Sequence, residues 1–145
     1  MSIAGGVFNA PLRGKSIGCD TIQIFVKNAN QWFGKPIGAE EVEQFRETKK
    51  ETGIEPIFSH NSYLVNLASP DEALYEKSIN SMLDEMERTE RLGLPFIVMH
   101  PAAHVGSGDE GGLKRIAAAM TAMRTPRLAV GRAIARPVLP TPGAR

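Results

Sequence analysis

The chain has 145 residues, of which 42% are hydrophobic and 23% charged, and its formal net charge is +1. This composition is typical of one soluble globular domain, and a single cysteine excludes a disulfide-stabilised scaffold. No apolar run is long enough to cross a bilayer and the first residues do not form a secretory signal, so we expect a cytoplasmic protein without a membrane partner.

Charge is distributed unevenly along the chain. All 16 acidic residues lie within residues 1–110, whereas the charged residues of 111–145 are all basic. A basic segment can bind nucleic acid. The bias of residues 125–145 toward Ala, Arg, Pro and Gly instead favours an out-of-frame reading of a GC-rich gene. We therefore predict a folded domain at 1–123 and a disordered tail at 124–145.

In the first part of the chain, Asn9 is suited to cap a short helix that ends near Ile17, before Gly18. Residues 21–26 are β-branched and aromatic, which predicts a buried strand. Residues 39–52 are charged except for one apolar face, and Gly53 follows, so a second helix is expected there.

The next strand is expected at residues 56–59. Ser69, Pro70 and Glu72 then form the pattern of a capping box, which predicts a helix from this point to about Leu92. A third strand is expected at 96–99 and a fourth helix at 113–123.

Strands that alternate with helices in this way predict parallel pairing and an α/β fold. The elements amount to about three βα units of a TIM (β/α)8 barrel. Three strands cannot close a barrel, which needs about eight, so we expect a partial barrel with unpaired edges.

Two of the three histidines end neighbouring strands. His60 follows the second strand and His100 follows the third. Catalytic groups of α/β barrels lie at the carboxyl ends of strands, where two imidazoles can share one metal ion. His104 stands four residues after His100, but Pro101 and Gly106 argue against a helical pair of ligands there.

Four segments stand out along the chain: Ser-Ile-Ala-Gly-Gly-Val at 2–7, Phe-Val-Lys-Asn-Ala-Asn-Gln-Trp at 25–32, His-Asn-Ser-Tyr-Leu-Val-Asn-Leu-Ala-Ser-Pro at 60–70, and His-Pro-Ala-Ala-His at 100–104. Their order and separations resemble the N-terminal part of endonuclease IV, the zinc-dependent apurinic/apyrimidinic endonuclease family of base-excision repair. The resemblance covers residues 2–123, and its most specific part is the stretch that begins at His60.

The resemblance implies a TIM barrel that cuts the DNA backbone on the 5′ side of an abasic site in double-stranded DNA. In this family three zinc ions assist the hydrolysis, and the enzymes are usually monomeric. His60 and His100 match two zinc ligands of one ion, whose third ligand is a glutamate.

The resemblance also implies residues that contact DNA. Gln31 matches a position that enters the minor groove, and Tyr63 with Leu64 matches a wedge that props open the base stack at the lesion. Trp32 is either a stacking platform or a packing residue, and Lys27 either meets a phosphate or is solvated. His104 either supports the metal ligands or faces a phosphate, or it is an exposed loop residue.

This sequence also departs from the family pattern. Met1 aligns inside a motif that a first barrel strand precedes in relatives, and residues 111–145 contain no carboxylate that could complete the metal site. We therefore expect at most one incomplete zinc site and no significant cleavage. Two other functions remain open: a non-catalytic DNA-binding remnant, and a sugar isomerase or epimerase on the same barrel.

Overall fold

Helices and strands alternate throughout the computed structural model, which describes residues 1–100 and 102–123. The elements, in chain order, are α1 Asn9–Ser16, β1 Ile22–Ile24, α2 Ala39–Thr52, β2 Ile57–His60, α3 Glu72–Arg91, β3 Ile97–Val98 and α4 Asp109–Met123. Their order and type confirm the predicted succession of βα units. The predicted tail, residues 124–145, lies outside the described residues.

The sheet is parallel and has the order β1-β2-β3. Ile22 of β1 pairs with Ile57 of β2, and His60 of β2 pairs with Val98 of β3. The two outer strands are shorter than the predicted 21–26 and 96–99, because each is paired on one side in this sheet. At the outer edge of β1, the amino terminus of Met1 donates to the carbonyl of Gln23.

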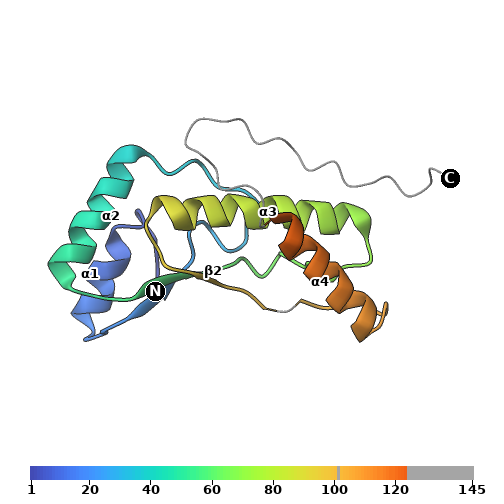
Figure 1. The fold of residues 1–145 in the computed structure, drawn as a ribbon. Coiled ribbons are helices and arrows are strands. Elements are labelled where there is room, and N and C mark those ends of the chain that lie inside the picture. Colours follow the sequence, from blue (N-terminus) through green and yellow to red (C-terminus); the bar gives the residue numbers. More distant parts are fainter. Residues whose placement is uncertain (101, 124–145) are drawn as a thin grey trace.

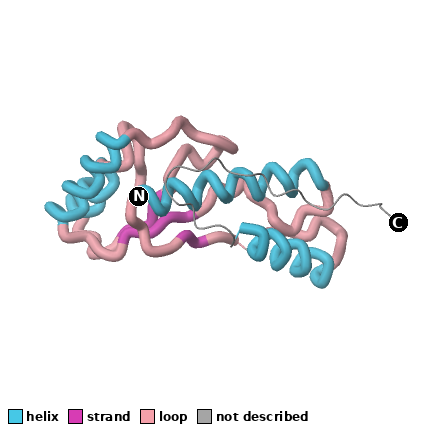
Figure 2. Tube along the Cα trace, turned by 45° about the horizontal axis from the view of Figure 1, so that its top comes forward, coloured by secondary structure: helices cyan, strands magenta, loops and turns pink. Residues whose placement is uncertain are grey.

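Two apolar clusters hold the elements together. The first packs α1 and α2 against the sheet around Phe45, whose side chain is fully buried. The second joins α3 to α4 through Tyr75, Met82 and Met123. α1 and α2 lie side by side at one end of the elongated molecule, α3 runs along its length, and α4 lies at the opposite end (Figures 1 and 2).

The starts of three helices differ from expectation. The N-cap of α1 is Phe8, without a side-chain cap, because the turn at Gly5 and Gly6 already brings the chain into a helical path before Asn9. α4 begins at Asp109, one turn before the predicted residue 113, since acidic residues in a first turn offset the glycine pair that follows them.

The capping of α3 also differs. Ser69 is buried and accepts a bond from the amide of Asp71, whereas Asp71 is the N-cap and accepts from the amide of Leu74 at 2.7 Å. The helix therefore starts two residues later than a cap at Ser69 requires. Pro70 consequently precedes the cap instead of occupying the first helical position.

None of the helices in the described ranges combines the length and apolar character that a membrane span needs.

Candidate functional site

The ends of β2 and β3 bring two imidazoles together. His60 is the last residue of β2, and His100 follows β3 by two residues. Since the strands are parallel neighbours, both side chains reach the same edge of the sheet, where their ring centroids are 5.0 Å apart. His60 is 5% exposed and His100 is exposed. The predicted proximity of the two histidines is thus present in the structure.

The hydrogen bond of His60 leaves its other ring nitrogen free for a metal ion. Its Nδ1 lies 2.7 Å from the backbone carbonyl of Asn61. A carbonyl can only accept, so Nδ1 is the donor, and in this tautomer Nε2 has the lone pair. In histidines that bind metals, the ring nitrogen that does not contact the metal typically donates such a hydrogen bond, which fixes the tautomer.

The distance between the rings can be compared with zinc geometry. Zinc–nitrogen bonds of about 2.0–2.1 Å at a tetrahedral angle place the centroids of two imidazole ligands about 5 Å apart. The observed separation therefore fits two ligands of one ion. Within residues 1–100 and 102–123, however, no group of three His, Cys, Asp or Glu side chains is close enough to hold a metal ion. The two histidines alone are fewer than the three or four ligands that zinc takes.

Aromatic rings surround the imidazoles. Tyr63 lies 5.3 Å from His60 and 5.5 Å from His100, measured between centroids, yet it is 69% exposed. Phe25, just after β1, lies 5.6 Å from His60 and 5.8 Å from Tyr63. Alternation along the first strand could have indicated Phe25, because it follows the buried Ile24 and faces the opposite side of the sheet.

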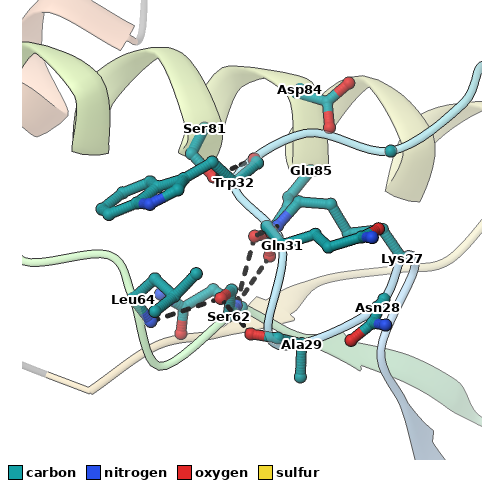
Figure 3. A network of polar contacts seen from close by, with 12 residues as sticks. Lys27, Asn28, Ala29, Gln31, Trp32, Ser62, Leu64, Ser81, Asp84 and Glu85 are labelled. Carbon is teal, nitrogen blue, oxygen red and sulfur yellow. Dashed lines mark hydrogen bonds and ion pairs between the residues drawn. The ribbon is translucent and has the colours of Figure 1, made fainter.

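The other residues expected to contact DNA lie in loops beside this cluster. Gln31 is exposed and Leu64 is half-buried, and the loops that carry them run next to each other (Figure 3). Trp32 is half-buried beneath the ammonium of Lys77, which lies 4.5 Å from the ring centroid. Its carbonyl accepts from Ser81 at 2.8 Å. These contacts support the packing interpretation of Trp32.

The structure contradicts both interpretations of Lys27 that were drawn from the sequence, a phosphate contact and a solvated side chain. The side chain is buried and its ammonium group is already paired. Its side chain is 2% exposed, and its Nζ lies 2.5 Å from a carboxylate oxygen of Glu85, which is 1% exposed. Burial raises the pKa of the Glu85 carboxyl, although Lys27 acts in the opposite direction. Sequence reasoning missed Glu85, whose only signal is its position three residues after Met82 on the buried face of α3.

His104 makes its contacts within its own loop. Its Nδ1 accepts from the amides of Gly106 and Gly108, each at 3.2 Å, and its Nε2 lies 3.4 Å from Asp109. A Cβ at Gly112 would approach the Cβ of His104 to 2.9 Å, so the loop packs closely on α4. This arrangement closes the loop that leads into α4, and a supporting role at the metal site stays a prediction.

Comparisons with known proteins agree with the parallel architecture. The family of xylose isomerase-like TIM barrels matches residues 13–128. The probable endonuclease 4 of Chloroflexus aurantiacus (strain ATCC 29366 / DSM 635 / J-10-fl) is 51% identical over 120 residues, which are 83% of this chain and 42% of that protein. The probable endonuclease 4 of Geobacter sulfurreducens is 48% identical over 116 residues, which are 80% of this chain and 39% of that protein.

A solved structure shows the same likeness. The crystal structure of endonuclease IV from Thermus thermophilus superposes with a TM-score of 0.72 at 33% identity, over 85% of this chain and 45% of that one. The chain thus spans less than half the length of these relatives, and the three βα units confirm the expected partial barrel. It belongs to the family of xylose isomerase-like TIM barrels and, within that family, is similar to endonuclease IV.

Proposed function

We propose that this chain carries part of a DNA repair endonuclease that cuts the backbone 5′ to abasic sites with the help of zinc. The observation that carries the proposal is the convergence of His60 and His100, 40 residues apart in the sequence, beneath the exposed ring of Tyr63. In this proposal, a metal ion held by the two histidines contacts the phosphodiester, and the exposed aromatic ring lies against the gap that the missing base leaves. The cytoplasm, where the DNA of a bacterium lies, is the compartment that this function requires.

Each residue has a role in this proposal. His60 and His100 hold one zinc ion, and Gln31 enters the minor groove. Tyr63 and Leu64 form the wedge that occupies the gap in the base stack. The exposed ring of Tyr63 is accessible to a ligand and lies beside two imidazoles, which supports a role in recognition.

Bound zinc would supply a Lewis acid and a hydroxide for phosphodiester hydrolysis. The described residues offer two imidazoles and no carboxylate beside them, so no step of hydrolysis can be derived from them. We infer that the part of the barrel described here recognises abasic double-stranded DNA as a monomer, binds zinc weakly through the two histidines, and does not cleave.

A sugar isomerase or epimerase would share this barrel, and the family match alone does not separate the two functions. The relatives at 48–51% identity bear the name endonuclease 4 and thereby favour the nuclease. The exposed Tyr63 beside Leu64 favours it too, since a pocket for a small sugar needs no exposed wedge.

DNA recognition can be tested by fluorescence anisotropy. The purified chain is titrated into a duplex with one tetrahydrofuran abasic analogue and into the same duplex without it, at several salt concentrations. We expect tighter binding to the abasic duplex and loss of this preference in Tyr63→Ala. Ile17→Ala is a matched control, because Ile17 is 71% exposed and lies at the end of α1, away from the site. Equal, salt-sensitive binding of both duplexes would indicate charge attraction only and refute the proposal.

Zinc binding needs a separate measurement. Competition against a chromophoric zinc indicator should show weaker zinc binding in His60→Ala and in His100→Ala than in the unmodified chain, whereas Ile17→Ala should bind as before. Incubation of the chain with abasic duplex and zinc should leave the strand intact. Strand cleavage that a chelator abolishes would disprove the inference that these residues do not cleave.

A further inference from the structure

One face of α3 is polar although it is buried. Ser78, Ser81, Glu85 and Arg88 stand three or four residues apart along the helix, and each is at most 6% exposed. Such spacing places them on one side of the helix, where a helix that packs on a sheet normally presents apolar side chains. Buried polar groups of this kind require hydrogen-bond partners, and their partners reveal what the face is for.

All four side chains bind backbone groups of loops, and Glu85 also binds the side chain of Lys27. Ser81 donates to the carbonyl of Trp32 at 2.8 Å, and Arg88 donates to two further carbonyls in the same loop, those of Gly34 and Lys35, each at 2.8 Å. Ser78 accepts from the amide of Asn66 at 3.0 Å, in the loop that follows β2. The polar face of α3 therefore fixes the paths of the loops that follow β1 and β2.

Glu85 joins these two loops to each other. Its carboxylate accepts from the amide of Ser62 at 3.0 and 3.2 Å and from Lys27 at 2.5 Å. Lys27 in turn donates to the carbonyl of Gln31 at 2.9 Å, and the Ser62 hydroxyl donates to the carbonyl of Ala29 at 2.6 Å. Figure 3 shows this network, in which both loops meet at one carboxylate of α3.

The chemistry at this position needs a carboxylate. Glu85 faces one ammonium group and one backbone N–H, and both are donors. An ionised carboxylate offers only acceptors, whereas a glutamine amide would turn an NH2 group toward one of the donors. The surroundings are also tight, since a Cβ at Gly34 would lie 3.1 Å from Lys27 and 3.2 Å from Arg88. A misfit at Glu85 cannot be absorbed without moving the loops.

The two loops carry the residues assigned above to DNA. Gln31 is held through its own carbonyl, and Tyr63 and Leu64 directly follow Ser62. We propose that Glu85 is a positioning residue, which acts through Lys27 and Ser62 to keep Gln31 and the Tyr63–Leu64 pair in one fixed arrangement for abasic DNA. This inference rests on the proposed function for its ligand, while the coupling of the two loops stands independently of it.

Hydrogen–deuterium exchange of the full chain tests the coupling. In Glu85→Gln we expect exchange to accelerate about tenfold or more in residues 28–35 and 61–66 together, the factor that corresponds to a loss of about 1.4 kcal/mol. Glu72→Gln is the matched control, because Glu72 is on the same helix but its carboxylate binds Arg115, away from both loops. Unchanged exchange in either loop would overturn the inference, since the proposal requires both loops to respond.

DNA binding tests the purpose of the coupling. Glu85→Gln should lower the preference for the abasic duplex over the intact one about tenfold, with little change in affinity for the intact duplex. A purely structural role would leave that ratio unchanged, and this result would overturn the proposal. If Glu85→Gln fails to fold, Lys27→Met combined with Glu85→Met takes its place, since an apolar pair leaves no buried charge unmatched.

The two hypotheses fail in different ways. If the unmodified chain shows no preference for abasic DNA, the proposed function fails and the exchange experiment still decides whether Glu85 couples the loops. If the preference is present and survives in Glu85→Gln, or in the double variant that takes its place, the proposed function stands and the positioning role of Glu85 is refuted.

Discussion

Replacing Lys27 with methionine should destabilise the protein far more than the loss of a surface lysine. The side chains of Lys27 and Glu85 are 2% and 1% exposed, so the substitution leaves a carboxylate buried without its cation. Breaking one side of a buried ion pair costs about 3–5 kcal/mol. A domain of this size has a free energy of unfolding of about 5–15 kcal/mol, so the variant should lose a large share of its stability.

Urea denaturation followed by circular dichroism measures this loss. Arg46 and Glu43 provide the control, because their side chains are 61% and 62% exposed and Glu43→Gln should cost less than about 1 kcal/mol. Lys27→Met with Glu85→Met should be more stable than Lys27→Met alone, because no buried charge is left unmatched. A loss below about 1 kcal/mol in Lys27→Met would mean that the pair is solvated, and the argument for a buried network would fail.

The pH dependence of the same variant gives an independent check. Burial already raises the pKa of Glu85 above its ordinary value of 4.5, and removal of Lys27 takes away the neighbour that opposes the rise. A carboxyl whose pKa is raised by folding contributes stability at low pH and loses it as the pH rises through the folded-state pKa. The destabilisation by Lys27→Met should therefore grow as the pH rises above about 4.5, and a constant difference between pH 4 and pH 8 would contradict this assignment.

Three further substitutions test other parts of the fold. Phe45→Ala empties a fully buried site and should cost about 3–5 kcal/mol in urea denaturation, so a loss under 1 kcal/mol would show that the first cluster repacks freely. Asn66→Ala removes side-chain bonds to the amide and carbonyl of Ala103 and should speed amide exchange in that loop; unchanged exchange would mean that the bonds do not hold it. A bidentate bond from Arg115 lowers the pKa of Glu72, so this contribution to stability is lost as the pH falls below 4.5. The difference in stability between the unmodified chain and Glu72→Gln should accordingly be present at pH 7 and shrink as the pH falls below 4.5, and a difference that stays constant over this range would exclude the ion pair as its cause.

Local signals predicted one element at residue accuracy. The helix at 39–52 was expected at its observed bounds, because Val42 and Phe45 share one apolar face, most of the other residues are charged, and Gly53, which adopts a left-handed backbone with φ 68°, follows as the stop. All of these signals act within a few residues of the helix. The start of α4 could not be found in the same way, because Gly111 and Gly112 weaken the local pattern and the reason for Gly112 is its approach to His104.

The candidate site was predictable as far as it follows from topology. His60 and His100 meet because they end adjacent parallel strands, and that arrangement follows from the order of the elements. The pairing of Lys27 with Glu85 was not predictable, since the two residues are 58 positions apart and a lysine that will be buried looks the same in sequence as one that is solvated. Only the packed structure distinguishes a recognition residue from one that supports recognition.

A buried residue beside an exposed one explains how the exposed side chain can still be held in a defined position. Tyr63 is 69% exposed, yet Ser62 directly before it is 1% exposed and is bonded at both its amide and its hydroxyl. The ring therefore stands on backbone whose conformational entropy is already lost during folding. In the proposed function, such a wedge would order less of the chain when DNA binds, and this would reduce the free-energy cost of association. By this argument, a loosened loop should weaken recognition of the lesion even when every side chain that touches DNA is unchanged.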